Sequence, residues 1–154
     1  MAVGLAKAYR YGHQALLERY ITGREFTVGI LDAIPLPIIE LRSPQPFFNY
    51  EAKYTDKTTE FVTKPELSPE LCEKLQSAAL SAHEALGCQH FSRVDMMLET
   101  DGSPYVLEVN TIPGMTSRSL LPLAARELGI SFGDLCERIV EAALVSEAAT
   151  EVHH

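Results

Sequence analysis

The stretch FSRVDMMLETDGSPYVLEVN, residues 91–110, predicts two antiparallel strands joined by a tight turn. Its two halves, 91–98 and 105–110, alternate polar and apolar residues as half-buried strands do. Between them, Asp101-Gly102 is a dipeptide typical of two-residue hairpin turns. The sequence therefore predicts a β-hairpin whose two faces carry different side chains.

A hairpin that is symmetric about this turn places Asp95 directly opposite Glu108, and Arg93 opposite Asn110. Glu108 and Asn110 then share a face with Val106. Opposed side chains lie roughly 4.5–5.5 Å apart at Cβ, where two carboxylates repel unless a cation lies between them. The alternative is an exposed sheet face with ordinary charges, and a shift of one residue in register would separate the pair.

A divalent metal ion is the simplest cation for this position. Carboxylate and amide oxygens suit Mg²⁺ or Mn²⁺ rather than Zn²⁺, and Mg²⁺ usually completes its shell with substrate phosphates. Without the metal, the opposed pair should be destabilising. Replacing both Asp95 and Glu108 by alanine is therefore predicted to raise the thermal stability of the metal-free protein.

The segment EVNTIPGMTSRSL, residues 108–120, continues from the second strand into a loop rich in hydroxyl groups. Gly114 has no Cβ, so a ligand oxygen can approach its backbone N–H. Ser117, Arg118 and Ser119 offer hydrogen bonds to an anionic group. The alternative is a structural turn followed by a helix N-cap.

The rest of the chain predicts an α+β fold in which an antiparallel sheet is flanked by helices. Ser68 and Pro69 mark the start of an amphipathic helix that Gly87 ends, and Ser131 with Asp134 forms a capping box. The expected strands are 15–21, 25–31, 35–41, 60–63, 91–98 and 105–110; the expected helices are 2–12, 69–86, 122–128 and one beginning at residue 131 that buries Phe132, Leu135, Ile139 and Ala143. Residues 42–58 are expected to form a long functional loop.

Composition excludes several classes of function. The 154 residues carry 13 Lys and Arg against 21 Asp and Glu, a net charge of −8, which disfavours binding to nucleic acid or to an anionic membrane surface. Three cysteines without a CxxC pair favour neither a disulfide framework nor a zinc site. The N-terminal residues do not resemble a signal peptide, so the expected location is the cytoplasm.

Four segments together resemble the D-alanine–D-alanine ligases of the ATP-grasp superfamily, specifically their C-terminal portion. These segments are ERYITGREFTVGIL (18–31), YEAKY (50–54), RVDMMLETDG (93–102) and YVLEVNTIPGMTSRSLLPLAAR (105–126). The resemblance extends from about Ala8 to Leu144. It implies that ATP phosphorylates the carboxylate of one D-alanine, and that the amine of a second D-alanine attacks the acyl phosphate, as a step toward peptidoglycan.

The resemblance also implies roles for the hairpin and the loop after it. Asp95, Glu108 and Asn110 resemble the ligands of two Mg²⁺ ions, and Arg93 resembles the arginine that stabilises the transferred phosphate. The N–H of Gly114 would help to bind the tetrahedral oxyanion. Ser119 and the backbone of Leu120 would hold the carboxylate of the second D-alanine.

The ATP site is implied by residues on both sides of the predicted first strand of the domain. Glu25 resembles the glutamate that binds ribose, and Lys53 resembles a lysine that binds phosphate. Tyr54 resembles the loop tyrosine that closes over the first substrate. The hinge strand that contacts adenine corresponds to Glu18, Arg19, Tyr20 and Ile21.

The resemblance divides the chain into three parts. Residues 1–21 are expected to be the end of a central-domain helix and the hinge strand, 22–145 the C-terminal ATP-grasp domain, and 146–154 a flexible tail. The groups that bind the first D-alanine belong to an N-terminal half without a counterpart here, so the isolated chain is expected to be inactive, and a homodimer is possible in this family. Two alternatives are another ATP-grasp ligase joining a carboxylate to an amine, and a non-catalytic nucleotide-binding remnant.

Overall fold

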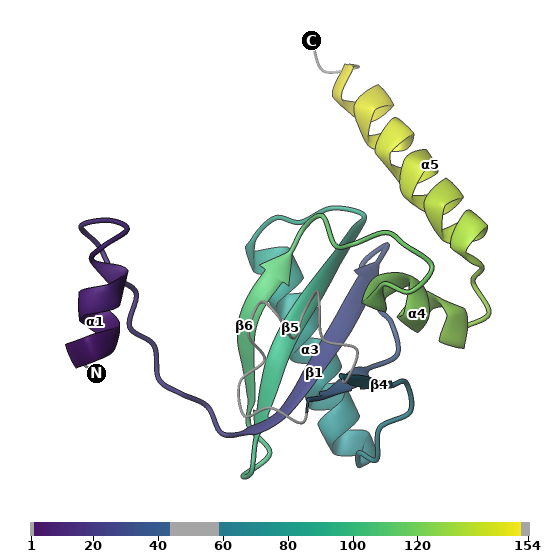
Figure 1. Ribbon diagram of the computed structural model, residues 1–154. Coiled ribbons are helices and arrows are strands. Elements are labelled where there is room, and N and C mark those ends of the chain that lie inside the picture. Colours follow the sequence, from purple (N-terminus) through teal and green to yellow (C-terminus); the bar gives the residue numbers. More distant parts are fainter. Residues whose placement is uncertain (1, 44–58, 152–154) are drawn as a thin grey trace.

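The computed structural model describes residues 2–43 and 59–151 (Figure 1). It confirms the α+β class: an antiparallel sheet has the strand order β4-β3-β1-β5-β6, with β2 paired to β1. The strands are β1 (Gly23–Leu31), β2 (Ile34–Pro35), β3 (Ile39–Arg42), β4 (Glu60–Val62), β5 (Phe91–Glu99) and β6 (Pro104–Asn110). The helices are α1 (Ala2–Ala8), α3 (Pro69–Ala85), α4 (Leu120–Glu127) and α5 (Phe132–Glu151).

Helix α3 covers one face of the sheet. Its buried Leu75 and Ala79 pack against β1 and β5, whose inward side chains on this face include Phe26, Val28 and Met96. The predicted caps of the helix are present: the Oγ of Ser68 accepts a hydrogen bond from the N–H of Leu71 at 3.3 Å, and Gly87 has φ +63°. This cluster is the larger part of the core.

Helix α4 and the start of α5 cover the opposite face. Leu121 of α4 and Leu135 of α5 are fully buried in a second cluster with Ile39 of β3. A Cβ added to Gly29 on β1 would lie 2.6 Å from the Cδ1 of Leu121, so the glycine allows α4 to lie close to the sheet. Because side chains alternate along β1, this is also the face of Thr27, and it carries the candidate site.

Helix α5 begins with the predicted capping box and then leaves the sheet (Figure 1). Of the four residues expected to be buried, Leu135 is buried and Ile139 is half-buried against the same cluster, whereas Phe132, at the first position, is 41% exposed and Ala143 is exposed. The helix continues to Glu151, so residues 146–151 extend it, and the flexibility of the end stays a prediction. No helix among the described residues has the length and apolar character needed to cross a membrane.

The expected strand 15–21 is wrong as a strand. Residues 12–22 have no regular secondary structure and connect α1 to β1 as an open segment (Figure 1). Extended backbone becomes a strand only when a neighbouring strand accepts and donates its hydrogen bonds. The described strand pairings begin at Gly23, so this segment has no such neighbour in the described part of the chain.

Candidate active site

Strands β5 and β6 carry the candidate site in the predicted register. Asp95 lies opposite Glu108, and Arg93 lies opposite Asn110. Asp95 is 4% exposed, whereas the side chain of Glu108 is 50% exposed. The pairing of a buried carboxylate with a half-exposed one is therefore confirmed.

A β-bulge between Asp95 and Met96 changes the pairing nearer the turn. Met96 pairs with Val106, and Met97 pairs with Tyr105, one residue away from the symmetric hairpin. Directly paired residues lie on the same face of a sheet, so Val106 lies on the face of Met96 and not on that of Glu108. The prediction that Val106 and Glu108 share a face is wrong for this reason.

The cation between the two carboxylates is a guanidinium group. Arg93 donates from Nε to Oδ1 of Asp95 at 2.9 Å and from Nη2 to Oδ2 at 2.8 Å. Its Nη2 also lies 4.0 Å from Oε1 of Glu108. Thr27 on β1 donates its hydroxyl to Oδ1 of Asp95 at 2.7 Å. The two carboxylates are therefore bridged electrostatically without a metal ion.

These contacts decide the protonation of Asp95. Burial raises the pKa of its carboxyl group, but the hydrogen bonds and charge of Arg93, with a smaller contribution from the Thr27 hydroxyl, outweigh burial and hold the pKa below its usual range. Asp95 is thus an anion at neutral pH. A buried anion of this kind can accept either a guanidinium group or a metal ion.

The donor set fits a hard divalent cation. In residues 2–43 and 59–151, no three His, Cys, Asp or Glu side chains are placed to hold a metal together, so a third protein oxygen would come from Asn110. Two carboxylates and an amide oxygen are chemically suited to Mg²⁺. The Oδ1 of Asn110 accepts a hydrogen bond from the N–H of Ile112 at 3.2 Å, which orients the amide oxygen. Two bound ions remain a prediction.

Six of the predicted site residues line one cavity of about 440 Å³. They are Arg93, Asp95, Asn110, Gly114, Ser119 and Leu120, and the wall is completed by Leu41, Phe61, Ile112 and Arg118. Strand β5 supplies Arg93 and Asp95, and the segment between β6 and α4 supplies Gly114, Arg118 and Ser119. Charged, amide and hydroxyl side chains and a glycine thus line a space large enough for a small ligand.

The loop before α4 is shaped by Gly114 and Ser119. A Cβ on Gly114 would lie 3.1 Å from the Oγ of Ser119, so a side chain there would crowd the serine. Ser119 precedes α4, but its hydroxyl does not cap the helix; it accepts the N–H of Thr116 at 3.1 Å and lies 2.9 Å from the Thr116 hydroxyl. The first N–H groups of α4 therefore have no hydroxyl cap from Ser119.

A second cavity of about 330 Å³ lies beside the start of β1. Tyr20 and Glu25, two of the predicted nucleotide-binding residues, line it, and Leu41 lines both cavities. Glu18 and Ile21 are not among the described residues that line it. Lys53 and Tyr54 fall on residues outside the described ranges, so their roles stay predictions.

Arg19 points elsewhere than the prediction for the hinge implied. Its Nη2 donates to both carboxylate oxygens of Glu99, at 2.5 and 2.7 Å, and its guanidinium lies 5.3 Å from the centre of the Tyr105 ring. Arg19 therefore binds the β5–β6 hairpin rather than lining the second cavity. It can still contribute through its backbone, as the resemblance implies for this segment.

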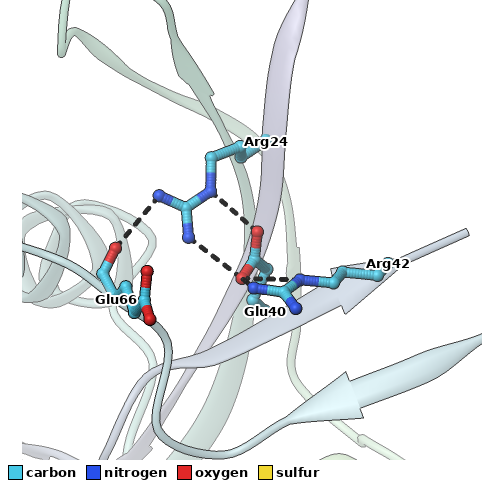
Figure 2. Close-up of polar contacts among 4 residues, drawn as sticks. All are labelled: Arg24, Glu40, Arg42 and Glu66. Carbon is cyan, nitrogen blue, oxygen red and sulfur yellow. Dashed lines mark hydrogen bonds and ion pairs between the residues drawn. The ribbon is translucent and has the colours of Figure 1, made fainter.

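Behind Glu25, on the face covered by α3, a buried glutamate joins two arginines (Figure 2). Glu40 on β3 accepts hydrogen bonds from Nε and Nη2 of Arg24 at 2.7 and 2.9 Å, and from Nε and Nη2 of Arg42 at 3.1 and 2.9 Å. Arg24 also donates to the carbonyl oxygen of Glu66 at 3.2 Å. This cluster ties β1 to β3 and to the segment before α3.

Glu40 is expected to make the protein sensitive to acid. The hydrogen bonds from Arg24 lower the pKa of Glu40 most strongly, and burial opposes them. The hydrogen bonds from Arg42 add to the lowering, so the pKa of Glu40 stays below its usual value. A lowered folded-state pKa stabilises the fold above the unfolded-state pKa, and that stability is lost as pH falls through the folded-state value. Glu40→Gln should lower the free energy of unfolding by about 2 kcal/mol at pH 7, and by less below about pH 4. Urea unfolding at each pH measures the loss.

Glu66→Gln is the matched control, because only the backbone carbonyl of Glu66 accepts the Arg24 hydrogen bond. It should lower stability by less than about 0.5 kcal/mol at neutral pH. Equal losses in the two variants, or a Glu40→Gln loss that does not change with pH, would contradict the assigned role.

Two residues that organise this region, Thr27 and Glu40, were not predicted from the sequence. Thr27 reaches Asp95 only because β1 pairs with β5, with Thr27 opposite Asp95. Glu40 interrupts the apolar stretch PLPIIEL, residues 35–41, and a lone charged residue inside such a stretch is a usable signal for a buried ion pair.

Comparison with known proteins agrees with this geometry. The family model described as D-ala D-ala ligase C-terminus matches residues 2–141. D-alanine–D-alanine ligases of Methylacidiphilum infernorum and Syntrophotalea carbinolica are 43% and 47% identical, over 89% and 93% of this chain and 45% and 47% of their own lengths. The crystal structure of the Bacillus anthracis ligase complexed with ATP is 38% identical, with a TM-score of 0.82 over 97% of this chain and 47% of its own.

The matched region therefore has the same extent in sequence and in structure. The chain spans about half the length of the curated relatives it matches. The family model covers most of this chain, and it describes the C-terminal part of the ligases. This chain belongs to the D-alanine–D-alanine ligase family, of which it represents the C-terminal portion.

Proposed function

We propose that this chain is the C-terminal catalytic half of an ATP-dependent ligase that joins two D-alanines through an acyl phosphate for peptidoglycan synthesis. The observation that supports this best is the 440 Å³ cavity, which brings six residues with implied roles to one place. Family membership makes this chemistry more probable than a different carboxylate–amine ligation.

ATP and Mg²⁺ are the proposed cofactors, and two ions would bind Asp95, Glu108 and Asn110. When bound, the ions would neutralise phosphate charge and orient the transferred group. The Bacillus anthracis relative was crystallised with ATP, which supports the same nucleotide here. Tyr20 and Glu25, which line the second cavity, would contact the nucleoside, and Lys53 its phosphates.

The residues of the first cavity have complementary tasks in this mechanism. Arg93 offers a guanidinium to the transferred phosphate, and the N–H of Gly114 offers a hydrogen bond to the oxyanion that forms when the amine attacks. Ser119 and the backbone of Leu120 lie at the N-terminus of α4, where a carboxylate is favoured by the exposed N–H groups. Tyr54 would close over the first D-alanine.

A complementary N-terminal half, in the same polypeptide or a separate one, would supply the remaining contacts to the first D-alanine. This follows from the share of the relatives that the chain spans. A homodimer is a further possibility for the complete enzyme. The cytoplasm is the proposed location, because the reaction consumes ATP.

The test is phosphate release from ATP and D-alanine with Mg²⁺. We expect no turnover from the 154-residue chain alone, and turnover when a separately produced N-terminal half of a close relative is added. The same half with D-serine or D-lactate in place of the second D-alanine tests substrate choice. Turnover by the chain alone would disprove the need for a second half, whereas nucleotide binding without rescue would favour a non-catalytic remnant.

A further inference from the structure

We propose that Arg93 occupies the cation position of the metal site in the metal-free chain, and that its guanidinium leaves Asp95 when a divalent ion binds. The proposal deepens the proposed function and rests on it for the identity of the ligands. Three observations support it: the place of the guanidinium, the hydrogen bonds that Arg93 makes to both Asp95 oxygens and the burial of both side chains.

The guanidinium of Arg93 stands where a bridging ion would stand. It donates to both oxygens of Asp95, at 2.9 and 2.8 Å, and its Nη2 lies 4.0 Å from Oε1 of Glu108. Asn110 is the residue opposite Arg93 in the ladder. One positive group therefore contacts the two candidate carboxylate ligands, and it belongs to the residue paired with the third candidate.

Both oxygens of Asp95 already accept hydrogen bonds in this arrangement. Oδ2 accepts from Arg93, and Oδ1 accepts from Arg93 and from the Thr27 hydroxyl at 2.7 Å. A carboxylate has about four lone-pair sites and three of them are occupied here, so a cation that binds both oxygens competes with Arg93 for them. Thr27 also lies 3.3 Å from the carbonyl oxygen of Val94, so its hydroxyl has a second acceptor on the same strand.

Because both side chains are buried, one metal ion replaces one guanidinium group at Asp95. The side chains of Arg93 and Asp95 are 13% and 6% exposed. Without a phosphate in the cavity to offset the charge, two cations held by one buried carboxylate would repel each other strongly. The arginine must therefore move away from Asp95 as the ion arrives, and it then faces the cavity that it lines.

The exchange has a function in the reaction. A bidentate pair keeps the buried carboxylate compensated before the metal arrives, and the displaced guanidinium becomes available to an anionic substrate. The pair also weakens metal binding, because the ion binds only the fraction of molecules in which Asp95 is released. Metal loading and phosphate recognition by Arg93 are thereby coupled.

The experiment measures Mn²⁺ binding to the 154-residue chain without nucleotide, by the EPR signal of free Mn²⁺. Arg93→Ala should bind Mn²⁺ at least about tenfold more tightly than Arg118→Ala. Arg118 lines the same cavity but is exposed, so its removal changes the net charge equally without releasing Asp95. Equal affinities of the two variants, or no Mn²⁺ binding by Arg93→Ala, would overturn the proposal.

A second measurement uses the unchanged chain, in case Arg93→Ala fails to fold. The ¹⁵N–¹H signal of Arg93 Nε, assigned with Arg93→Lys, should shift on titration with Mg²⁺ in parallel with the side-chain amide signal of Asn110. Saturation of the Asn110 signal without change at Arg93 would overturn the exchange. Neither measurement uses D-alanine or turnover, so failure of the proposed function is observed separately, in the phosphate-release assay.

Discussion

Replacing Asp95 by alanine is expected to lower the free energy of unfolding of the metal-free chain by about 3–5 kcal/mol. The loss arises because the guanidinium of Arg93, 13% exposed in the fold, loses the carboxylate to which it donates two hydrogen bonds. Breaking a buried pair by removing one partner costs far more than a surface pair contributes. Urea unfolding in the presence of a chelator measures this change.

The double variant Asp95→Ala with Glu108→Ala is expected to be less stable still. Nη2 of Arg93 lies 4.0 Å from Oε1 of Glu108, so Glu108 is the nearest replacement partner in the single variant. This reverses the sign predicted from the sequence, which treated the two carboxylates as an uncompensated repulsive pair. The reversal follows from the guanidinium between them.

Glu108→Ala alone is the control, because the side chain of Glu108 is 50% exposed and its ion pair with Arg93 is long, at 4.0 Å. It should change stability by no more than about 1 kcal/mol. If the double variant melted at a higher temperature than the unchanged chain in chelator, the repulsion would dominate and the compensation by Arg93 would be wrong.

The sequence predicted the pairs at Asp95 and Arg93 correctly, although its hairpin model was off by one residue near the turn. Met97 pairs with Tyr105, and the bulge between Asp95 and Met96 adds one residue to β6, which restores the predicted pairs at Asp95 and Arg93. A bulge depends on the twist and packing of the whole sheet, so alternation within one hairpin does not reveal it. The one-residue shift near the turn and the one-residue bulge thus cancel at Asp95 and Arg93.

Contacts between distant segments were beyond the sequence patterns. Arg19 reaches Glu99, 80 residues away, and Thr27 reaches Asp95, 68 residues away. Local periodicity gives the faces of each strand but not the order of strands in the sheet, which decides these contacts. The caps at Ser68 and Ser131 were predictable because they depend only on neighbours within three residues.

Gly23→Ala is the second variant with a large expected effect, a loss of about 2–3 kcal/mol. Gly23 starts β1 and pairs with Glu99. A Cβ there would overlap the carbonyl oxygen of Leu98, and it would lie 2.7 Å from the carbonyl carbon of Leu98 and 3.1 Å from the Cα of Glu99. These are backbone atoms in a strand, so a change of rotamer cannot relieve the overlap.

The overlap at the added Cβ can be removed only if β1 and β5 separate at this end, beside the second cavity. Gly23 lines that cavity together with Tyr20 and Glu25, so the proposed binding of a nucleotide there should weaken along with stability. Hydrogen exchange at the backbone N–H groups of Arg24 and Leu98, the next pair of residues along the β1–β5 ladder, locates the separation. Gly12→Ala is the control, since nothing lies within 4 Å of its added Cβ, and it should stay within about 0.5 kcal/mol of the unchanged chain. Equal stabilities of the two variants would show that β1 and β5 are not in contact at Gly23.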